Sequence, residues 1–280
     1  MTDAAVSSTL KRLRDERDSD PESPAPDEEA AEPVPPYHWN RRHRLFSRFD
    51  EGILLDKRLS PPSFCFFFFF SKLSHVTALA HTRTEMWYSV TPECIAQHTA
   101  ARFAGRALVL DPFAGAGGNA IQFAARRDIA FVVAADVVPA RAARCQHNAR
   151  VYGAHRRLDT LCADARRLPL RPVADAVFLS PPWGGPAYKA RVPYPLAAVR
   201  PDGLAVFRAA AALAPAVAYY LPVATDAADV RRLLAALGAA RPAAPRVCEL
   251  EFNCIDGVPR TLTVYFGSLV RAPPPPSPHP

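Results

Sequence analysis

The sequence of 280 residues predicts an α/β fold built on a mostly parallel, doubly wound sheet of about seven strands. From residue 92 onward, short apolar runs typical of buried strands alternate with helical stretches. Two alternating segments then flank an Asp256-Gly257 turn, at Val247–Phe252 and Thr261–Phe266. An Asp-Gly pair between alternating strands is typical of a hairpin, so we expect the sheet to end in an antiparallel pair.

The elements follow one another at spacings that suit βα units. Five apolar segments are expected to be strands: Ala107–Asp111, Ala130–Asp136, Leu161–Ala163, Ala174–Phe178 and Ala216–Leu221. Helices are expected at Ile95–Phe103 and near residues 119–127, 139–151, 196–213 and 226–238. Ligands of such sheets bind at the carboxyl ends of the strands, so the residues that follow each strand are the candidates for a site.

A glycine-rich turn follows the first strand. Asp111 closes the strand and Pro-Phe-Ala-Gly-Ala-Gly-Gly-Asn leads through Gly115 and Gly117 to Asn119. Glycines at a strand-to-helix turn let a nucleotide approach the backbone, but the spacing is not G-x-G-x-x-G. An acidic residue here would repel a pyrophosphate, whereas it suits the ammonium group of a cofactor that carries an amino acid, such as S-adenosylmethionine.

Two further aspartates end the next two strands. Asp136 stands 25 residues after Asp111, where a carboxylate can bind the two ribose hydroxyls, and Asp164 could face the adenine amine. A single aspartate at a strand end is ordinarily a cap or turn former. The order of the features, rather than any one of them, indicates a methyltransferase core.

The fourth expected strand leads into Phe-Leu-Ser-Pro-Pro-Trp-Gly-Gly-Pro-Ala-Tyr at residues 178–188. Prolines fix φ and donate no hydrogen bond, so we expect the carbonyls around Pro181 and Pro182 to stay free as acceptors. A planar amino group could donate to these carbonyls and to the Ser180 hydroxyl while its ring stacks on Trp183. This arrangement suits methyl transfer to an exocyclic nitrogen of a base.

These motifs together resemble the trimethylguanosine synthase family, whose members hypermethylate the 7-methylguanosine cap of small nuclear and nucleolar RNAs. The resemblance rests on residues 111–124 and 178–186, and on Arg-Leu-Phe-Ser-Arg-Phe-Asp at 44–50, Trp-Tyr-Ser-Val-Thr-Pro-Glu at 87–93 and Leu-Thr-Val-Tyr-Phe-Gly at 262–267. It runs from about residue 37 to residue 271. It implies a Rossmann-like class I S-adenosylmethionine-dependent methyltransferase.

The resemblance also implies roles for individual residues. The cofactor would be bound by Asp111, Phe113, Gly115, Gly117, Asn119, Asp136, Asp164, Ser180 and Thr91. Ser89, Val90 and Thr91 would close over it. The cap would be held by Trp183, Pro182 and Tyr188, with Ser180, Pro181 and Trp183 as the catalytic residues; no metal site is expected. Tyr188 would contact the cap phosphates or ribose.

One departure from the family pattern concerns the phosphates. After Tyr220-Leu-Pro222 the family typically carries Arg-Asn, which helps to hold the cap triphosphate, and this chain carries Val223-Ala224. Losing a bidentate phosphate donor is not conservative. Two alternatives therefore stay open: another RNA or DNA amino-methyltransferase, acting on adenine or on ribosomal guanine, and a catalytically weakened paralogue that binds capped RNA.

The rest of the chain divides by composition. Residues 1–36 are an acidic tail expected to be disordered, residues 37–57 an N-terminal extension of the catalytic domain, and residues 272–280 a proline-rich tail. Residues 58–84 interrupt a segment that is continuous in the family, and we interpret them as an insertion, either disordered or a gene-model artefact. A hydrophobic docking helix is the alternative. The aromatic run at 64–70 is too short to cross a bilayer.

Charge and cysteine content fit an intracellular RNA-binding protein. The formal net charge is +7, and the acidic side chains are concentrated in residues 1–36, which hold ten against four basic ones. A basic body suits a polyanionic substrate, although 30 Arg against four Lys also fits a GC-rich gene. The six cysteines form no C-x-x-C pair, which indicates reduced thiols. We expect a monomer that binds capped RNA and no membrane, in the nucleus or else the nucleolus or cytoplasm.

Overall fold

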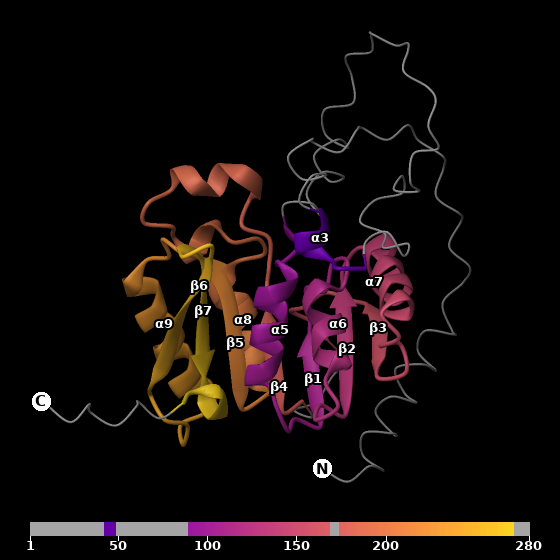
Figure 1. Ribbon diagram of the computed structural model, residues 1–280. Helices are drawn as coiled ribbons and strands as arrows, with labels where there is room; N and C mark the ends of the chain where they lie inside the picture. The colour runs from indigo at the N-terminus through magenta and orange to yellow at the C-terminus, as the bar shows by residue number, and fades with distance from the viewer. Residues whose placement is uncertain (1–41, 49–88, 169–173, 272–280) are drawn as a thin grey trace, which may run out of the picture. The chain divides into compact units, whose positions relative to one another are not determined.

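The computed structural model describes residues 42–48, 89–168 and 174–271 (Figure 1). The two expected tails and residues 58–84 lie outside the described residues, so these domain boundaries stay predictions. The chain forms two compact units, residues 1–169 and 170–280, and each is described by itself.

The first unit contains three parallel strands. They are β1 (Leu108–Asp111), β2 (Phe131–Asp136) and β3 (Leu158–Cys162). β2 lies between the other two, with Val132 paired to Val109 on one side and to Leu158 on the other. β3 begins earlier than the sequence predicted, because Leu158 and not Leu161 is its first residue.

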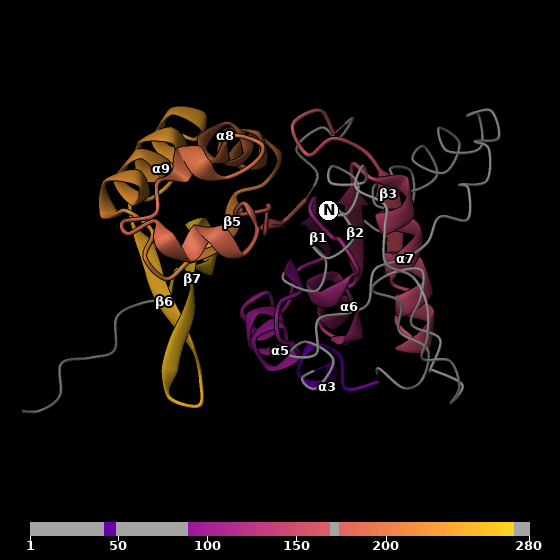
Figure 2. The same cartoon turned by 90° about the horizontal axis from the view of Figure 1, so that it is seen from above.

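The helices of the first unit are α3 (Arg42–Leu45), α5 (Glu93–Arg102), α6 (Gly118–Ala125) and α7 (Pro139–Val151). α6 lies between α5 and α7 (Figures 1 and 2). It is apolar on nearly every side and almost wholly buried, which fits a central helix. The rings of Phe103 and Phe123 meet with their centroids 4.7 Å apart, which packs the end of α5 against α6.

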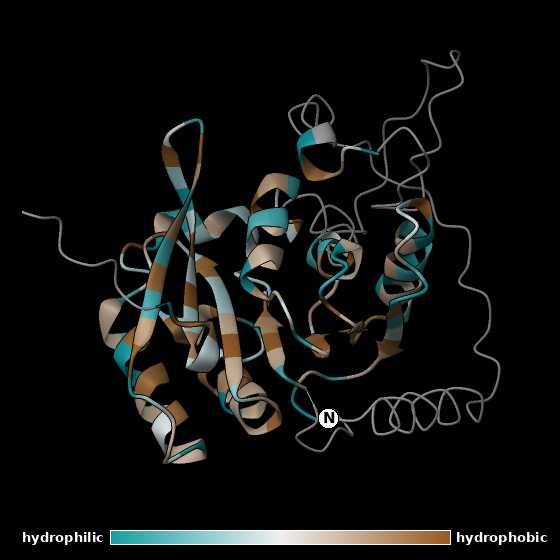
Figure 3. Cartoon of the chain, turned by 60° about the horizontal axis from the view of Figure 1, so that its bottom comes forward, coloured by the Kyte–Doolittle hydropathy of each residue, from teal (hydrophilic) through white to brown (hydrophobic). Residues whose placement is uncertain are grey.

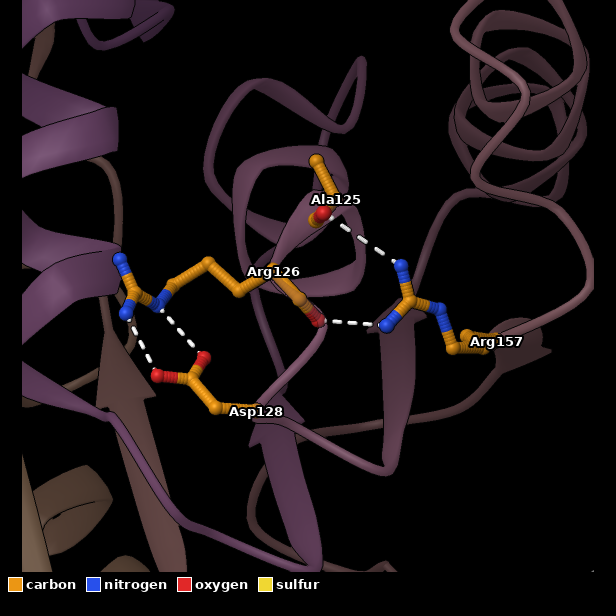
Figure 4. A network of polar contacts seen from close by, with 4 residues as sticks. All are labelled: Ala125, Arg126, Asp128 and Arg157. Carbon is orange, nitrogen blue, oxygen red and sulfur yellow. Dashed lines mark hydrogen bonds and ion pairs between the residues drawn. The ribbon is translucent and has the colours of Figure 1, made fainter.

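Arginines tie together the loops at the amino end of β2. Arg126 forms an ion pair with Asp128 at 2.6 Å, and Arg157 donates to the carbonyls of Arg126 at 2.6 Å and Ala125 at 3.4 Å (Figure 4). The Arg157 contacts use carbonyls at the end of α6, which have no partner within the helix. These contacts lie at the opposite end of β2 from Asp136.

The second unit holds four strands, β4 (Ala176–Leu179), β5 (Ala216–Pro222), β6 (Cys248–Ile255) and β7 (Val258–Phe266). β4 is parallel to β5, whereas β7 is antiparallel to both β5 and β6. Every residue of β5 is buried, as expected for a continuous apolar run. The hairpin turns at Asp256 and Gly257, both with positive φ (54° and 73°), which confirms the predicted turn.

The helices of the second unit are α8 (Gly203–Leu213) and α9 (Ala227–Ala240), which lie on the same side of β5 and β7 (Figure 2). The predicted helix at 196–213 is wrong at its start. Residues Leu196–Ala198 form a separate 3-10 turn, and α8 begins only after Pro201, with Asp202 accepting a hydrogen bond from the Ala205 N–H at 2.8 Å. A proline inside a helix interrupts it, which explains the later start.

The strand order is β3-β2-β1-β4-β5-β7-β6, which is the predicted seven-stranded, mostly parallel sheet with antiparallel strands at its C-terminal end. Buried strands are largely hydrophobic, whereas the β6–β7 hairpin alternates between hydrophilic and hydrophobic residues (Figure 3). Among the helices of the described residues, none has the length and apolar character needed to span a membrane.

Candidate active site

The residues predicted to bind the cofactor and those predicted to bind the base fall into different units. The glycine-rich loop and the three aspartates belong to the first unit, and Ser180 to Tyr188 belong to the second. We describe the two groups in turn.

Asp111 is a completely buried carboxylate at the end of β1. Burial is the main reason that its pKa is raised to about 7, and the negative charge of Asp136 adds to the rise. One oxygen accepts from the Phe113 N–H at 3.2 Å, which opposes the rise. The other oxygen has no hydrogen-bond partner within the described residues. A buried acceptor without a partner is costly, so this atom is suited to a ligand that donates.

Asp136 fastens the glycine-rich loop. Its carboxylate accepts from the Gly115 N–H at 3.1 Å and, through the other oxygen, from the Val138 N–H at 2.9 Å. Burial raises its pKa, and these two N–H groups and the charge of Arg141 oppose that rise. A carboxylate has about four acceptor positions. Capacity therefore remains for the ribose hydroxyls that the sequence assigned to it.

The two glycines of the loop are required for different reasons. Both have positive φ, 52° at Gly115 and 90° at Gly117, a conformation that disfavours other residues. A Cβ at Gly117 would stand 2.9 Å from Sγ of Cys145, so the helix below leaves no room for a side chain. At Gly115 nothing lies within 4 Å of that position. The backbone of Gly115 is therefore open to a ligand.

Asn119, in the first turn of α6, is held by a residue from far away in the sequence. Its amide donates to the Thr91 hydroxyl at 2.9 Å, just before α5. Its buried carbonyl oxygen has no partner within the described residues. The structure thus brings these two predicted cofactor residues together and leaves a second buried acceptor beside the glycine-rich loop.

Glu93 is a buried carboxylate that the sequence did not single out. It accepts hydrogen bonds from the backbone and hydroxyl of Ser47, from Gln97, from Gln122 of α6 and from the Tyr152 hydroxyl after α7. These donors come from four separate parts of the first unit. Glu93 therefore ties residues 44–48 to the helices that carry the glycine-rich loop.

Apolar and cationic contacts support this junction. Phe46 is fully buried, and its ring centroid lies 6.1 Å from that of Tyr152. The Arg48 guanidinium lies 5.6 Å from the centre of the Tyr152 ring, and it also donates to the Val151 carbonyl at 3.2 Å. Burial of a large apolar ring contributes roughly 1.5–3 kcal/mol. Phe46 thus anchors the short segment to the unit.

Asp164, expected to face the adenine amine, already has a strong partner. Arg166 donates to both of its oxygens, at 3.0 Å from Nε and 2.6 Å from Nη2. This side-chain contact is the main reason that the pKa of Asp164 is lowered to about 2. The carboxylate is therefore ionised at neutral pH, and a base amine would have to share it with Arg166.

In the second unit, the residues after β4 form the proline loop, Ser180–Trp183. Pro181 is buried, and within the described residues no hydrogen bond reaches its carbonyl. The expectation of free carbonyls is wrong for Pro182, because that carbonyl accepts from the Arg200 N–H at 3.1 Å. The prediction overlooked that a loop distant in sequence supplies the donor. The Trp183 carbonyl accepts from the Tyr194 hydroxyl at 3.0 Å.

Four aromatic residues surround this loop and form what we call the aromatic cluster: Trp183, Tyr188, Tyr194 and Tyr220. The Trp183 ring lies 5.3 Å from Tyr220 and 5.2 Å from Tyr188, measured between centroids. Tyr194 lies edge-on to Tyr188 at 6.3 Å. The indole nitrogen of Trp183 is buried and has no partner in the part of the chain that the structure describes. Aromatic packing therefore holds the indole, without help from a hydrogen bond.

Comparison with known proteins decides what these residues belong to. The family model described as RNA cap guanine-N2 methyltransferase matches residues 106–269, which include both units. A curated trimethylguanosine synthase from Schizosaccharomyces pombe is 32% identical over 255 residues, or 84% of this chain and 87% of that protein. The chain belongs to the RNA cap guanine-N2 methyltransferase family. The trimethylguanosine synthase of Saccharomyces cerevisiae is 29% identical, over 70% of the methyltransferase described here and 56% of its own length.

Solved structures resemble the methyltransferase more distantly. TrmN from Thermus thermophilus is 24% identical, with a TM-score of 0.42 over 63% of this chain and 49% of that chain. The family membership therefore rests on sequence, and it makes the chain an S-adenosylmethionine-dependent enzyme.

The first unit of the methyltransferase offers groups that fit this cofactor. The unpartnered oxygens of Asp111 and Asn119 are buried acceptors, and the backbone at Gly115 has open space before it. The sequence located all three residues, but it missed Glu93, Tyr194 and Cys145. These three act through contacts with residues far away in the chain, for which no local motif exists.

Proposed function

We propose that this methyltransferase methylates the exocyclic N2 amine of 7-methylguanosine on capped small nuclear and nucleolar RNAs, giving 2,2,7-trimethylguanosine. The observation that carries the substrate assignment is the proline loop, where the open Pro181 carbonyl adjoins a tryptophan held by two tyrosines. RNA processing of this kind places the enzyme in the nucleus, where we expect it to act as a monomer.

We assign cofactor binding to residues of the first unit. Asp111 would bind the ammonium group of S-adenosylmethionine, since an ionised carboxylate and an ammonium attract most strongly when both are buried. Asp136 would accept hydrogen bonds from the ribose hydroxyls, and Asp164 from the adenine amine. Gly115 and Gly117 would allow close approach of the cofactor, while Phe113, Thr91 and Asn119 would line it. When bound, the cofactor supplies an electrophilic methyl group on a sulfonium.

We assign the acceptor base to residues of the second unit. The face of Trp183 would stack on 7-methylguanine, whose positive charge strengthens attraction to an indole. The Ser180 hydroxyl and the Pro181 carbonyl would accept the hydrogens of the N2 amine, which orients its lone pair for the in-line displacement. Pro182 would border the base and Tyr188 the ribose or the phosphates. Alignment supplies most of the rate enhancement in such a displacement.

The proposal is tested with short capped RNAs and radiolabelled S-adenosylmethionine. We expect label on a 7-methylguanosine cap and none on adenine in the same RNA. Label on adenine or on internal guanine would favour the alternative of another amino-methyltransferase. Cap binding without any label would favour the alternative of a weakened cap-binding paralogue.

A further inference from the structure

Three arginines of the second unit lie around the aromatic cluster. Burial raises the pKa of Tyr188, and the positive charge of Arg260 opposes this rise. Burial likewise raises the pKa of Tyr194, opposed by Arg191 and Arg200. Each guanidinium is therefore close enough to act electrostatically on a tyrosine of the cluster.

The position of Arg260 on β7 is informative. β5 and β7 are antiparallel, and the last pair on this side is Pro222 with Thr261. The next residues in register are Val223 on β5 and Arg260 on β7. Residues opposite each other on adjacent strands have their Cβ atoms about 4.5–5.5 Å apart. Arg260 thus stands directly beside the position where the sequence lacks the arginine expected after β5.

Arg260 is also available for a ligand. Its side chain is exposed, and no hydrogen bond or ion pair engages it within the described residues. Arg200 differs, since it donates to the carbonyls of Ala197 at 2.7 Å and Val199 at 3.2 Å. A guanidinium without an acidic partner can bind an anion without first breaking an ion pair, and its fork matches phosphate oxygens.

We propose that Arg260 binds the phosphate bridge of the RNA cap, so that β7 supplies the phosphate-binding arginine in place of β5. The inference rests on the proposed function, because the phosphates are placed by the stacking of the cap base on Trp183. A cap carries its phosphates through the ribose of that base, so a cation beside Tyr188 lies at the edge of the same binding surface. Arg260 would then favour phosphorylated cap over the free nucleoside.

The test measures binding of 7-methylguanosine triphosphate and of the nucleoside 7-methylguanosine. We expect Arg260→Ala to weaken binding of the triphosphate by about tenfold, and to leave binding of the nucleoside unchanged. Adding Val223→Arg to that variant should restore triphosphate affinity, because the new arginine stands beside the lost one. Arg231→Ala, an exposed arginine on α9, is the matched control and should change neither affinity.

The outcomes separate this inference from the proposed function. If the unmodified protein binds neither compound, the proposed function fails. If it binds the triphosphate and Arg260→Ala binds it equally well, or if Arg231→Ala weakens it as much, the role of Arg260 is wrong and the proposed function stands. Equal weakening of the nucleoside in Arg260→Ala would also contradict the inference, since it would show a general disturbance of the cluster.

Discussion

Asp111 and Asp136 lie at the carboxyl ends of neighbouring parallel strands, and the charge of Asp136 adds to the burial that raises the pKa of Asp111 to about 7. At neutral pH the Asp111 carboxyl is thus poised between its two protonation states. A cationic group of a ligand favours the ionised state. The affinity of the first unit for such a ligand should therefore depend on pH near neutrality.

Stability without cofactor should fall as pH rises toward 8. The folded pKa of Asp111 lies above the unfolded value of 3.8, so the folded state holds a proton that the unfolded state loses. The stabilising contribution is full below the unfolded pKa and disappears as pH rises through about 7. Asp111→Asn cannot ionise. Its melting temperature should fall less than that of the unmodified protein between pH 5 and pH 8, and equal falls would contradict the assigned pKa.

The same variant should lose cofactor binding. Affinity of the unmodified protein for S-adenosylmethionine should weaken as pH drops below about 7, since protonation of Asp111 removes the attraction for the ammonium group. Calorimetry in buffers of different ionisation enthalpy would detect the proton released on binding near pH 6.5. An Asp111→Asn protein with full affinity would show that this carboxylate does not touch the cofactor.

Asp136→Ala should weaken S-adenosylmethionine binding by about tenfold or more, because charge-assisted hydrogen bonds contribute roughly 1.5–3 kcal/mol each. It should also loosen the loop, since Asp136 holds the Gly115 N–H. Asp128→Ala is the matched control at the other end of β2, where an exposed ion pair with Arg126 contributes little (Figure 4). Equal cofactor affinity in the two variants would remove Asp136 from the site.

Trp183→Ala should abolish methyl transfer and leave cofactor affinity unchanged, because the indole is assigned to the base and not to the cofactor. Stacking of a base on an aromatic ring is worth roughly 1–3 kcal/mol. Trp183→Phe keeps a smaller ring against Tyr220 and should retain part of the activity. If cofactor affinity collapses in the alanine variant, the role of Trp183 is to support the fold.

Glu93→Ala should lower the free energy of unfolding by about 2 kcal/mol or more, since several donors lose a buried carboxylate acceptor. Hydrogen exchange should rise at residues 44–48 and around Tyr152, the two segments that Glu93 joins. Gln97→Ala removes one donor from the same carboxylate and should change both readouts far less. Exchange that is unchanged at residues 44–48 would show that Phe46 alone anchors the segment.

The sheet was predictable because its signals are local. The continuous apolar run of β5 and the Asp256-Gly257 turn each specify an element with the residues they contain. The start of α8 was missed because the helical pattern continues upstream of Pro201, and only the Asp202 cap marks the true beginning. Propensity and pattern gave different boundaries there, and the proline decided.

The site was predictable where chemistry repeats in order along the chain, as it does at Asp111, Asp136 and Asp164. It was not predictable where one residue gathers partners from afar. Glu93 stands 46 residues from Ser47 and 59 from Tyr152, so no spacing reveals their contact. The Pro182 carbonyl meets the Arg200 N–H in the same way. Arg260 has meaning only through its register with β5.

The most direct measurement is transfer of label from S-adenosylmethionine to two cap dinucleotides that differ only in the N7 methyl group. We expect label on N2 of the 7-methylated cap and little or none on the unmethylated cap, because stacking on Trp183 favours the cationic base. A protein that binds the cofactor yet labels neither cap, or labels both equally, would contradict the assignment of a 7-methylguanosine N2 methyltransferase.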